Sequence, residues 1–213
     1  MTSGDPPAER DLAAGAFAPW LHMMQRALRA EVEADVPCNG CTACCRSSQF
    51  VHIDPDETDT LAHIPVELRF PAPGLGPGHV VLGYDDRGHC PMLRDDGCTI
   101  YEHRPRACRT YDCRVYAATR VEPDAGKPAI VDRVRRWRFP YTGAEDAARQ
   151  RAVLAARAFL DAHPELAPSH PNVRATLALD LHELFLQDDL DIDAVRAAID
   201  DARARAGASP EQR

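Results

Sequence analysis

Apolar residues recur every three or four positions between Pro19 and Val36, and charged residues lie on the opposite face of the same stretch. Trp20, Leu21 and Met24 belong to this apolar face. Proline suits the first turn of a helix, and a second proline at position 37 cannot continue one. The pattern therefore predicts a helix from about residue 19 to residue 36, which leads directly into the next segment.

The same helical periodicity returns in the second half of the chain. The predicted helices lie near residues 130–137, 142–163, 169–187 and 193–206. Thr142 with Glu145 three residues later has the pattern of a capping box, which would start the second of these helices. Asp54, Pro55 and Glu57 show the same signals and predict a shorter helix that ends near position 64.

Strand patterns occur in the middle of the chain. Phe50–Ile53 is a short apolar stretch, and His79–Tyr84 runs through a turn into Cys90–Leu93, which predicts a hairpin. A second turn at 95–97 presents Cys98. The predicted fold class is mainly α, with helices packed around a small irregular cysteine-rich metal-binding core that contains a short β-hairpin.

The predicted organisation has three parts within one compact domain. Residues 1–37 form an N-terminal helical segment, residues 38–115 a cysteine-cluster core, and residues 116–213 a C-terminal helical region. A chain of 213 residues is long enough for one domain of this kind.

All cysteines of the chain fall within the middle part, and four of them form a C-x-x-C-x-x-C-C run. Neighbouring thiols seldom meet the geometry of a disulfide, but they can converge on a metal. The candidate metal ligands are Cys38, Cys41, Cys44, Cys45, Cys90, Cys98, Cys108 and Cys113.

Composition narrows the possible partners and location. The net charge of −8 argues against a general nucleic-acid-binding surface and against binding to anionic membranes. No stretch has the length of an apolar membrane span, and no secretory signal is visible, so we expect a cytoplasmic protein without membrane or nucleic-acid partners. In a reducing compartment, clustered cysteines indicate metal ligands or redox groups.

The cysteine spacing leaves two metals open. Cys38, Cys41 and Cys44, with Cys90 before a proline, have the spacing of ferredoxin ligands, which favours a four-iron cluster. Zinc bound by turn-borne cysteines is the alternative. Eight thiols could fill two mononuclear sites, or one cluster with four thiols remaining for a second metal or redox work.

Basic residues gather near the cysteines of this acidic chain. We expect them to balance the negative charge of a thiolate–metal centre. His89 and His103 are the histidines nearest to the cysteines in sequence, and we expect neither to be a ligand. The arginines in question are Arg46, Arg104, Arg106, Arg109 and Arg114.

The cysteine run, Cys90-x-x-Leu93 and the segment from Cys98 to Tyr111 together resemble the bacterial CxxCxxCC cysteine-cluster family. The resemblance covers about residues 38 to 113 and implies a zinc- or iron-chelating domain. Flagellin lysine N-methylases share the cysteine motif and are associated with an iron–sulfur cluster and S-adenosylmethionine. The present chain shows no clear nucleotide-binding loop.

Three classes of function stay open at this point. The chain is a metal-binding protein with a structural or transferable centre, a cluster-dependent enzyme related to the lysine N-methylases, or a redox or metal sensor. Whether it catalyses a reaction, and which protein partner it has, does not follow from the sequence. No catalytic residues are assigned.

Overall fold

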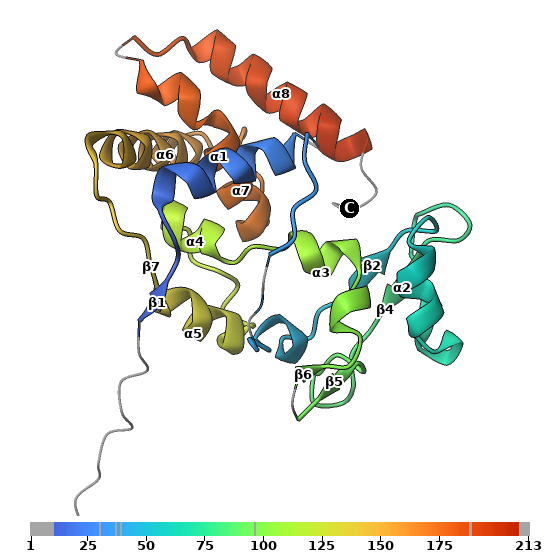
Figure 1. Cartoon of the computed structure of the whole chain (residues 1–213). Coiled ribbons are helices and arrows are strands. Elements are labelled where there is room, and N and C mark those ends of the chain that lie inside the picture. Colours follow the sequence, from blue (N-terminus) through green and yellow to red (C-terminus); the bar gives the residue numbers. More distant parts are fainter. Residues whose placement is uncertain are drawn as a thin grey trace, which may run out of the picture.

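The computed structural model describes residues 11–29, 31–36, 38, 40–95, 97–187 and 189–208. The predicted fold class is confirmed: the chain is mainly α, with few and short strands. Figure 1 shows most helices gathered on one side of the molecule, together with the strands at Leu12–Ala13 and Trp137–Arg138, and the other labelled strands with α2 (Thr58–His63) on the other side. Pro37, which we expected to end the first helix, lies outside the described residues.

The helical side is built around α7 (Pro171–Leu181), which contacts α1 (Phe17–Leu28), α4 (Arg114–Thr119), α6 (Ala144–Ala162) and α8 (Ile192–Ala208). Leu179 is fully buried and packs in one apolar cluster with Phe17, Val115 and Val153. A second cluster, which includes Leu160, Leu181 and Ile199, lies between α6, α7 and α8. Burial of these apolar faces is the main force that holds the helices together.

The first helix is shorter than its apolar pattern predicts. It ends at Leu28, and the N–H of Glu31 then donates to the carbonyl of Arg26 at 2.9 Å, a wide turn that closes the helix. Arg29 next turns toward Asp180, with 3.1 Å between Nε and Oδ1. The chain from residue 31 to residue 36 therefore approaches the cysteines as an irregular segment rather than as a helix.

The two predicted capping boxes do not start their helices. The N-cap of α6 is Gly143. The carboxylate at the start of this helix is that of Asp146, which accepts hydrogen bonds from the N–H groups of Ala18 and Thr142. The short helix α2 (Thr58–His63) begins at Thr58 rather than after Asp54. The Asp54 N–H still donates to Glu57 Oε1 at 3.0 Å, so this half of the motif closes a turn before the helix.

The strands form three small sheets. A three-stranded antiparallel sheet has β4 (Val80–Leu82) between β2 (Val51–Ile53) and β3 (Arg69–Pro71). The prediction that 79–84 pairs with 90–93 is therefore wrong, because β4 pairs with strands that precede it in the chain. The short hairpin is β5 (Leu93–Arg94) with β6 (Gly97–Cys98). A third, parallel pair joins β1 (Leu12–Ala13) to β7 (Trp137–Arg138).

The remaining helices lie on either side of the cysteines. The short helix α3 spans Arg106–Thr110 and contacts β2, and α5 spans Pro128–Arg136 and contacts the single-turn helix η1 (Cys44–Arg46). Three further single turns are η2 (Val66–Leu68), η3 (Tyr101–His103) and η4 (His182–Leu186).

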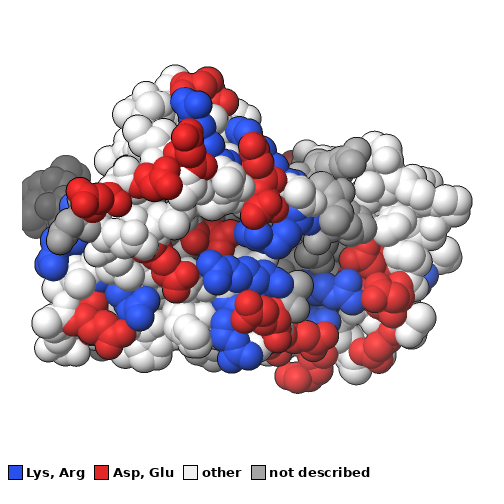
Figure 2. Space-filling view, turned by 90° about the horizontal axis from the view of Figure 1, so that it is seen from above, with Lys and Arg blue, Asp and Glu red and all other residues white. Residues whose placement is uncertain are grey.

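Charges on the helical side are largely paired with one another. Acidic and basic side chains alternate over the face shown in Figure 2, and neither sign forms a continuous patch there. Asp180, for example, forms ion pairs with both Arg29 and Arg205. No helix within the described residues is both long and apolar enough to cross a membrane.

Candidate metal centre

The first cysteines lie on a tight turn. The N–H of Cys41 donates to the carbonyl of Cys38 at 2.8 Å, and Gly40 between them has φ of +76°. A residue with a side chain rarely adopts this backbone conformation, so glycine is what allows the turn to close. Cys44 and Cys45 begin η1 three residues after Cys41.

The middle cysteines are held against this turn by backbone hydrogen bonds. The N–H of Cys90 donates to the carbonyl of Cys45 at 2.7 Å, and the carbonyl of Cys90 accepts from Leu93 at 2.9 Å. The chain then enters the β5–β6 hairpin, which carries Cys98. The pairing of Leu93 with Cys98 reverses the chain just before Cys98, as predicted, although Asp96 of the predicted turn lies outside the described residues.

The last cysteines and the incoming chain are tied together. Cys108 lies in α3, and Cys113 is the N-cap of α4. The N–H of Val36 donates to the carbonyl of Arg109 at 2.7 Å, and the N–H of Cys38 donates to the hydroxyl of Tyr101 at 3.1 Å. All eight cysteines are partly buried and none forms a disulfide.

Electrostatic interactions between the thiols divide them into groups. Cys45, Cys90, Cys98 and Cys108 each interact with the other three, and we call these the first cysteine group. Cys44 interacts most strongly with Cys113 and then with Cys41.

The second cysteine group therefore consists of Cys41, Cys44 and Cys113, since Cys113 also interacts with Cys41. Cys38 interacts with Cys45, Cys98 and Cys108 of the first group and with Cys41 of the second. Weaker interactions of Cys44 with Cys45 and Cys108, and of Cys45 with Cys41, also join the two groups, which therefore adjoin each other. The neighbours Cys44 and Cys45 consequently contribute to different groups. This grouping differs from the ferredoxin-like set expected from spacing, in which Cys44 and Cys90 belong together.

Burial shifts the thiols toward their protonated form. It raises the pKa of Cys45 to about 12 and that of Cys113 to about 11, and it raises the pKa of Cys44 well above its ordinary value. Neighbouring thiols add to the shift in each case, because two thiolates repel each other. A cation bound here must therefore displace protons from these sulfurs.

The sulfur atoms are not gathered around a single point. Among the described residues, no three cysteine Sγ atoms lie within 4.8 Å of one another. Thiolates on one zinc ion, each about 2.3 Å from the metal, would lie only about 3.8 Å apart. In a four-iron cluster each cysteine binds a different iron, so the sulfurs lie further apart than around one ion.

Two cationic side chains act on the thiols. Arg104 is 6% exposed and lies over the ring of Tyr101, and its charge lowers the pKa of Cys38 against the larger effect of burial. Arg133 of α5 acts in the same direction on Cys38 and on Cys113. These charges offset part of the negative charge that bound thiolates would carry.

The other arginines that we expected near the centre differ in their partners. Arg106 pairs with Asp54 and Asp56, and Arg114 pairs with Asp112. Arg46 donates to Thr42 at 3.1 Å and is exposed. Arg109 has a buried Nε without a hydrogen-bond partner among the described residues.

A neutral donor completes the surroundings of the second group. The indole N–H of Trp137 donates to Cys113 Sγ at 3.2 Å, which favours the thiolate and opposes the effect of burial on the pKa. Trp137 is held in place by the pairing of β1 with β7 and by Arg133, which lies 4.6 Å from its ring centroid. Sequence reasoning missed Trp137 and Arg133, because both follow the last cysteine, Cys113, by 20 or more residues in the sequence.

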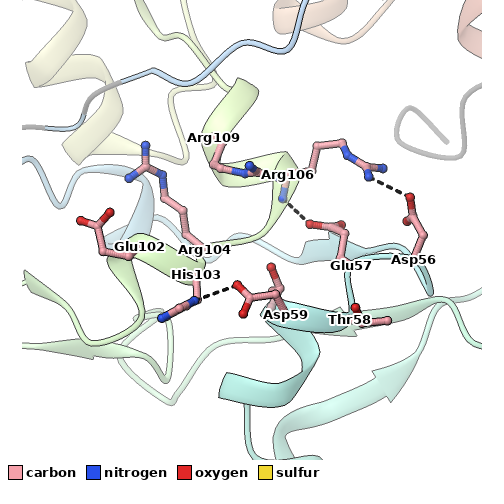
Figure 3. A pocket seen from close by; sticks show the side chains of 10 residues that line it. Asp56, Glu57, Thr58, Asp59, Glu102, His103, Arg104, Arg106 and Arg109 are labelled. Carbon is pink, nitrogen blue, oxygen red and sulfur yellow. Dashed lines mark hydrogen bonds and ion pairs between the residues drawn. The ribbon is translucent and has the colours of Figure 1, made fainter.

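A polar pocket of about 230 Å³ lies beside α3. In Figure 3, Arg106 reaches Asp56 and its backbone N–H reaches Glu57, while His103 pairs with Asp59. His103 was expected not to be a cysteine-centre ligand, and in the structure it bonds to this carboxylate. Most of the charged side chains in the pocket walls have partners, but the buried Nε of Arg109 has none among the described residues.

Comparison with known proteins bears on the same segment. Residues 37–125 match the family model CxxCxxCC, described as "Putative zinc- or iron-chelating domain". The resemblance inferred from the cysteine motif is thereby confirmed, and the family description supports metal binding. No curated protein and no solved structure matches the chain.

Proposed function

We propose that the chain binds an iron–sulfur cluster through the first cysteine group. Cys45, Cys90, Cys98 and Cys108 interact mutually, and they supply the four thiolates that a [4Fe–4S] cluster takes. The observation that carries the proposal is this mutual grouping of four partly buried thiols that are spaced too widely for one zinc ion.

The second cysteine group, with Cys38, supplies the thiolates for a second centre. Cys113 of this group accepts a hydrogen bond from Trp137 and interacts with Arg133, and both residues stabilise negative charge on its sulfur. We assign these thiols to a second metal ion rather than to the cluster. Adjacent residues Cys44 and Cys45 would then bind different centres, which accounts for the C-C pair that ends the run.

Zinc in both groups is the second candidate. The turn that joins Cys38 to Cys41 is of the kind that zinc sites use, and the family description names zinc as well as iron. This reading requires the sulfurs of each group to move closer together on binding. It keeps the same cysteines as ligands.

The proposed activity is metal binding. A cluster-dependent reaction related to that of the lysine N-methylases, and redox or metal sensing, are the alternatives, and both would use the same thiols. A cluster bound here would supply one-electron chemistry, while the chain's own residues hold it, shield it and set its charge.

Anaerobic purification followed by iron, sulfide and zinc analysis tests the proposal. We expect a brown protein with about four irons and four sulfides per chain, and broad absorption near about 400 nm that bleaches on reduction. The matched pair of variants is Cys90→Ala and Cys113→Ala. The first should lose the iron and the second should keep it. A colourless preparation with two zinc ions per chain would reject the cluster and favour the zinc reading.

A further inference from the structure

Two histidines and an aspartate meet at one corner of the three-stranded sheet. His52 belongs to β2, Asp54 follows β2 directly, and His79 directly precedes β4. The strands are antiparallel with Ile53 opposite Val80, so the register places Asp54 next to His79. Pairing of the strands therefore brings together residues that are far apart in sequence.

The three side chains direct one atom each toward a common point. His52 Nε2 lies 3.2 Å from His79 Nδ1, His79 Nδ1 lies 3.1 Å from Asp54 Oδ1, and His52 Nε2 lies 3.8 Å from Asp54 Oδ1. Ligands bound about 2.0–2.2 Å from one metal ion lie about 3.0–3.6 Å from one another, depending on coordination geometry. We propose that His52, Asp54 and His79 form a divalent transition-metal site, separate from the cysteine centre.

Burial of the aspartate supports the assignment. Asp54 is 6% exposed, and its buried Oδ1 atom makes no hydrogen bond among the described residues, where only a protonated His79, with Nδ1 at 3.1 Å, can pair with it. A buried carboxylate oxygen without a partner is costly, and a bound cation removes that cost. The side chains of His52 and His79 are 14% and 18% exposed, so the site is sheltered but open to an entering ion.

The other oxygen of Asp54 is fixed by neighbouring residues. Arg106 Nη1 lies 3.0 Å from Asp54 Oδ2, which leaves Oδ1 to face the histidines. The N–H of Asp54 donates to Glu57 Oε1 at 3.0 Å, and Glu57 Oε2 accepts from the N–H of Arg106. Partners that orient a ligating carboxylate in this way are a regular part of metal sites.

The donor set indicates the kind of metal. Two imidazole nitrogens and one carboxylate suit zinc or iron(II), and they differ from the thiolates of the cysteine groups. Three protein ligands leave a coordination position open for water, as in catalytic rather than structural zinc sites. A second trio, Asp59, His63 and His103, is more exposed, and its histidine rings are stacked 3.5 Å apart on each other. It serves as the matched control.

Zinc binding to the full chain tests the proposal. The protein is equilibrated anaerobically with zinc at buffered free concentration, and cysteine-bound metal is counted in the same sample as a check on folding. We expect one further zinc ion per chain in the wild type and in His63→Ala. In His79→Ala and His79→Gln this ion should be lost, with affinity at least about 100-fold weaker and the cysteine-bound metal unchanged.

Equal zinc counts in the wild type and His79→Gln would overturn the proposal, as would a wild type that takes up no ion beyond the cysteine-bound metal. The latter result would identify the trio as a His79–Asp54 ion pair. A measurement without variants guards against misfolding. Zinc should shift the side-chain ¹⁵N resonances of His52 and His79 in the wild-type protein, and resonances unchanged at saturating zinc would also reject the site.

Discussion

The helical region and the cysteine region of this chain are stabilised in different ways. The helices α1, α4, α6, α7 and α8 share two apolar clusters, and many of their side chains are fully buried. Between residues 40 and 113 the buried apolar cluster is small, formed by Ile53, Ile64, Leu82, Met92 and Ile100. The short strands and single turns of this region are held together largely by ion pairs and by backbone hydrogen bonds around the cysteines.

The difference shows where each region obtains its stability. Apolar burial stabilises the helical region directly. The buried apolar cluster of the cysteine region is small, so we expect the proposed metal centre to supply much of the folding free energy of this region. Changes in the two regions should therefore have separable effects on metal content and on stability.

Loss of one thiol from the first group should have the largest effect. In Cys108→Ala the cluster loses a ligand, and binding energy on the order of 10 kcal/mol, as for structural zinc, is no longer available for folding. We expect hydrogen exchange by mass spectrometry to show lost protection across residues 40–113 with protection retained in α6 and α7. Cys113→Ala is the control and should retain the iron. Equal melting temperatures of Cys108→Ala and wild type would contradict the argument.

A cavity in the helical core should give the opposite pattern. Leu179 is fully buried, and Leu179→Ala should lower the free energy of unfolding by about 2–5 kcal/mol. Metal content of the folded protein should not change, because Leu179 lies in the helical cluster. Urea unfolding followed by circular dichroism measures the first effect and metal analysis the second. Leu186→Ala, at a site that is 45% exposed, is the control and should be nearly neutral.

Acid should weaken the helical region through one buried histidine. Nδ1 of His182 donates to the carbonyl of Leu179 at 2.8 Å, and Nε2 accepts from Arg149 at 3.4 Å, so the ring is neutral. Burial lowers the pKa of His182 below its ordinary 6.5. Below pH 6.5 the unfolded chain binds a proton that the folded chain does not, so stability decreases as the pH falls.

Through this histidine, the free energy of unfolding changes by at most about 1.4 kcal/mol per pH unit, which corresponds to the binding of one proton. His182→Gln can keep both hydrogen bonds and does not titrate, so it should show a smaller loss of stability between about pH 7 and pH 5. Urea midpoints measured at several pH values for both proteins check this. Parallel curves for the two proteins would exclude His182 as the titrating group.

The smallest expected effect concerns the surroundings of the second cysteine group. Trp137→Phe keeps the apolar ring but removes the N–H that donates to Cys113, at a cost of about 1.5 kcal/mol or more when that sulfur is a thiolate. Metal affinity of the second group should fall by about 10-fold or more, as when a partner of a metal ligand is removed. Iron in the first group should be unaffected. Competition with a zinc chelator measures the affinity, and loss of iron together with zinc would contradict the division into two groups.

The sequence predicted the features that depend on local patterns. The periodicity of residues 142–163 and 193–206 placed α6 and α8 to within a few residues, and the turn before Cys98 was found from its glycine and aspartates. The resemblance to the CxxCxxCC family was found from the cysteine run together with the segment from Cys98 to Tyr111, because this local pattern is itself the motif.

Features that depend on distant residues were not predictable in this way. Local propensity does not indicate that β4 pairs with β2 and β3, because pairing depends on which segments the whole chain brings together. Asp146 replaced Glu145 as the carboxylate at the start of α6, since it also reaches the N–H of Ala18 at the start of α1. For the same reason, the sequence did not predict that His52 of β2 lies close to His79, which directly precedes β4.

The contacts between residues 36–38 and residues 101–109 also determine the order in which the chain can assemble. They join positions more than 60 residues apart, as in the hydrogen bond between Cys38 and Tyr101 with a separation of 63. A metal shared by Cys45 and Cys108 closes a loop of similar length, and a covalent cross-link of that span removes about 4 kcal/mol of chain entropy from the unfolded state. Because such loops close slowly, the helical region should fold first and the cysteine region should follow at a rate that depends on metal concentration.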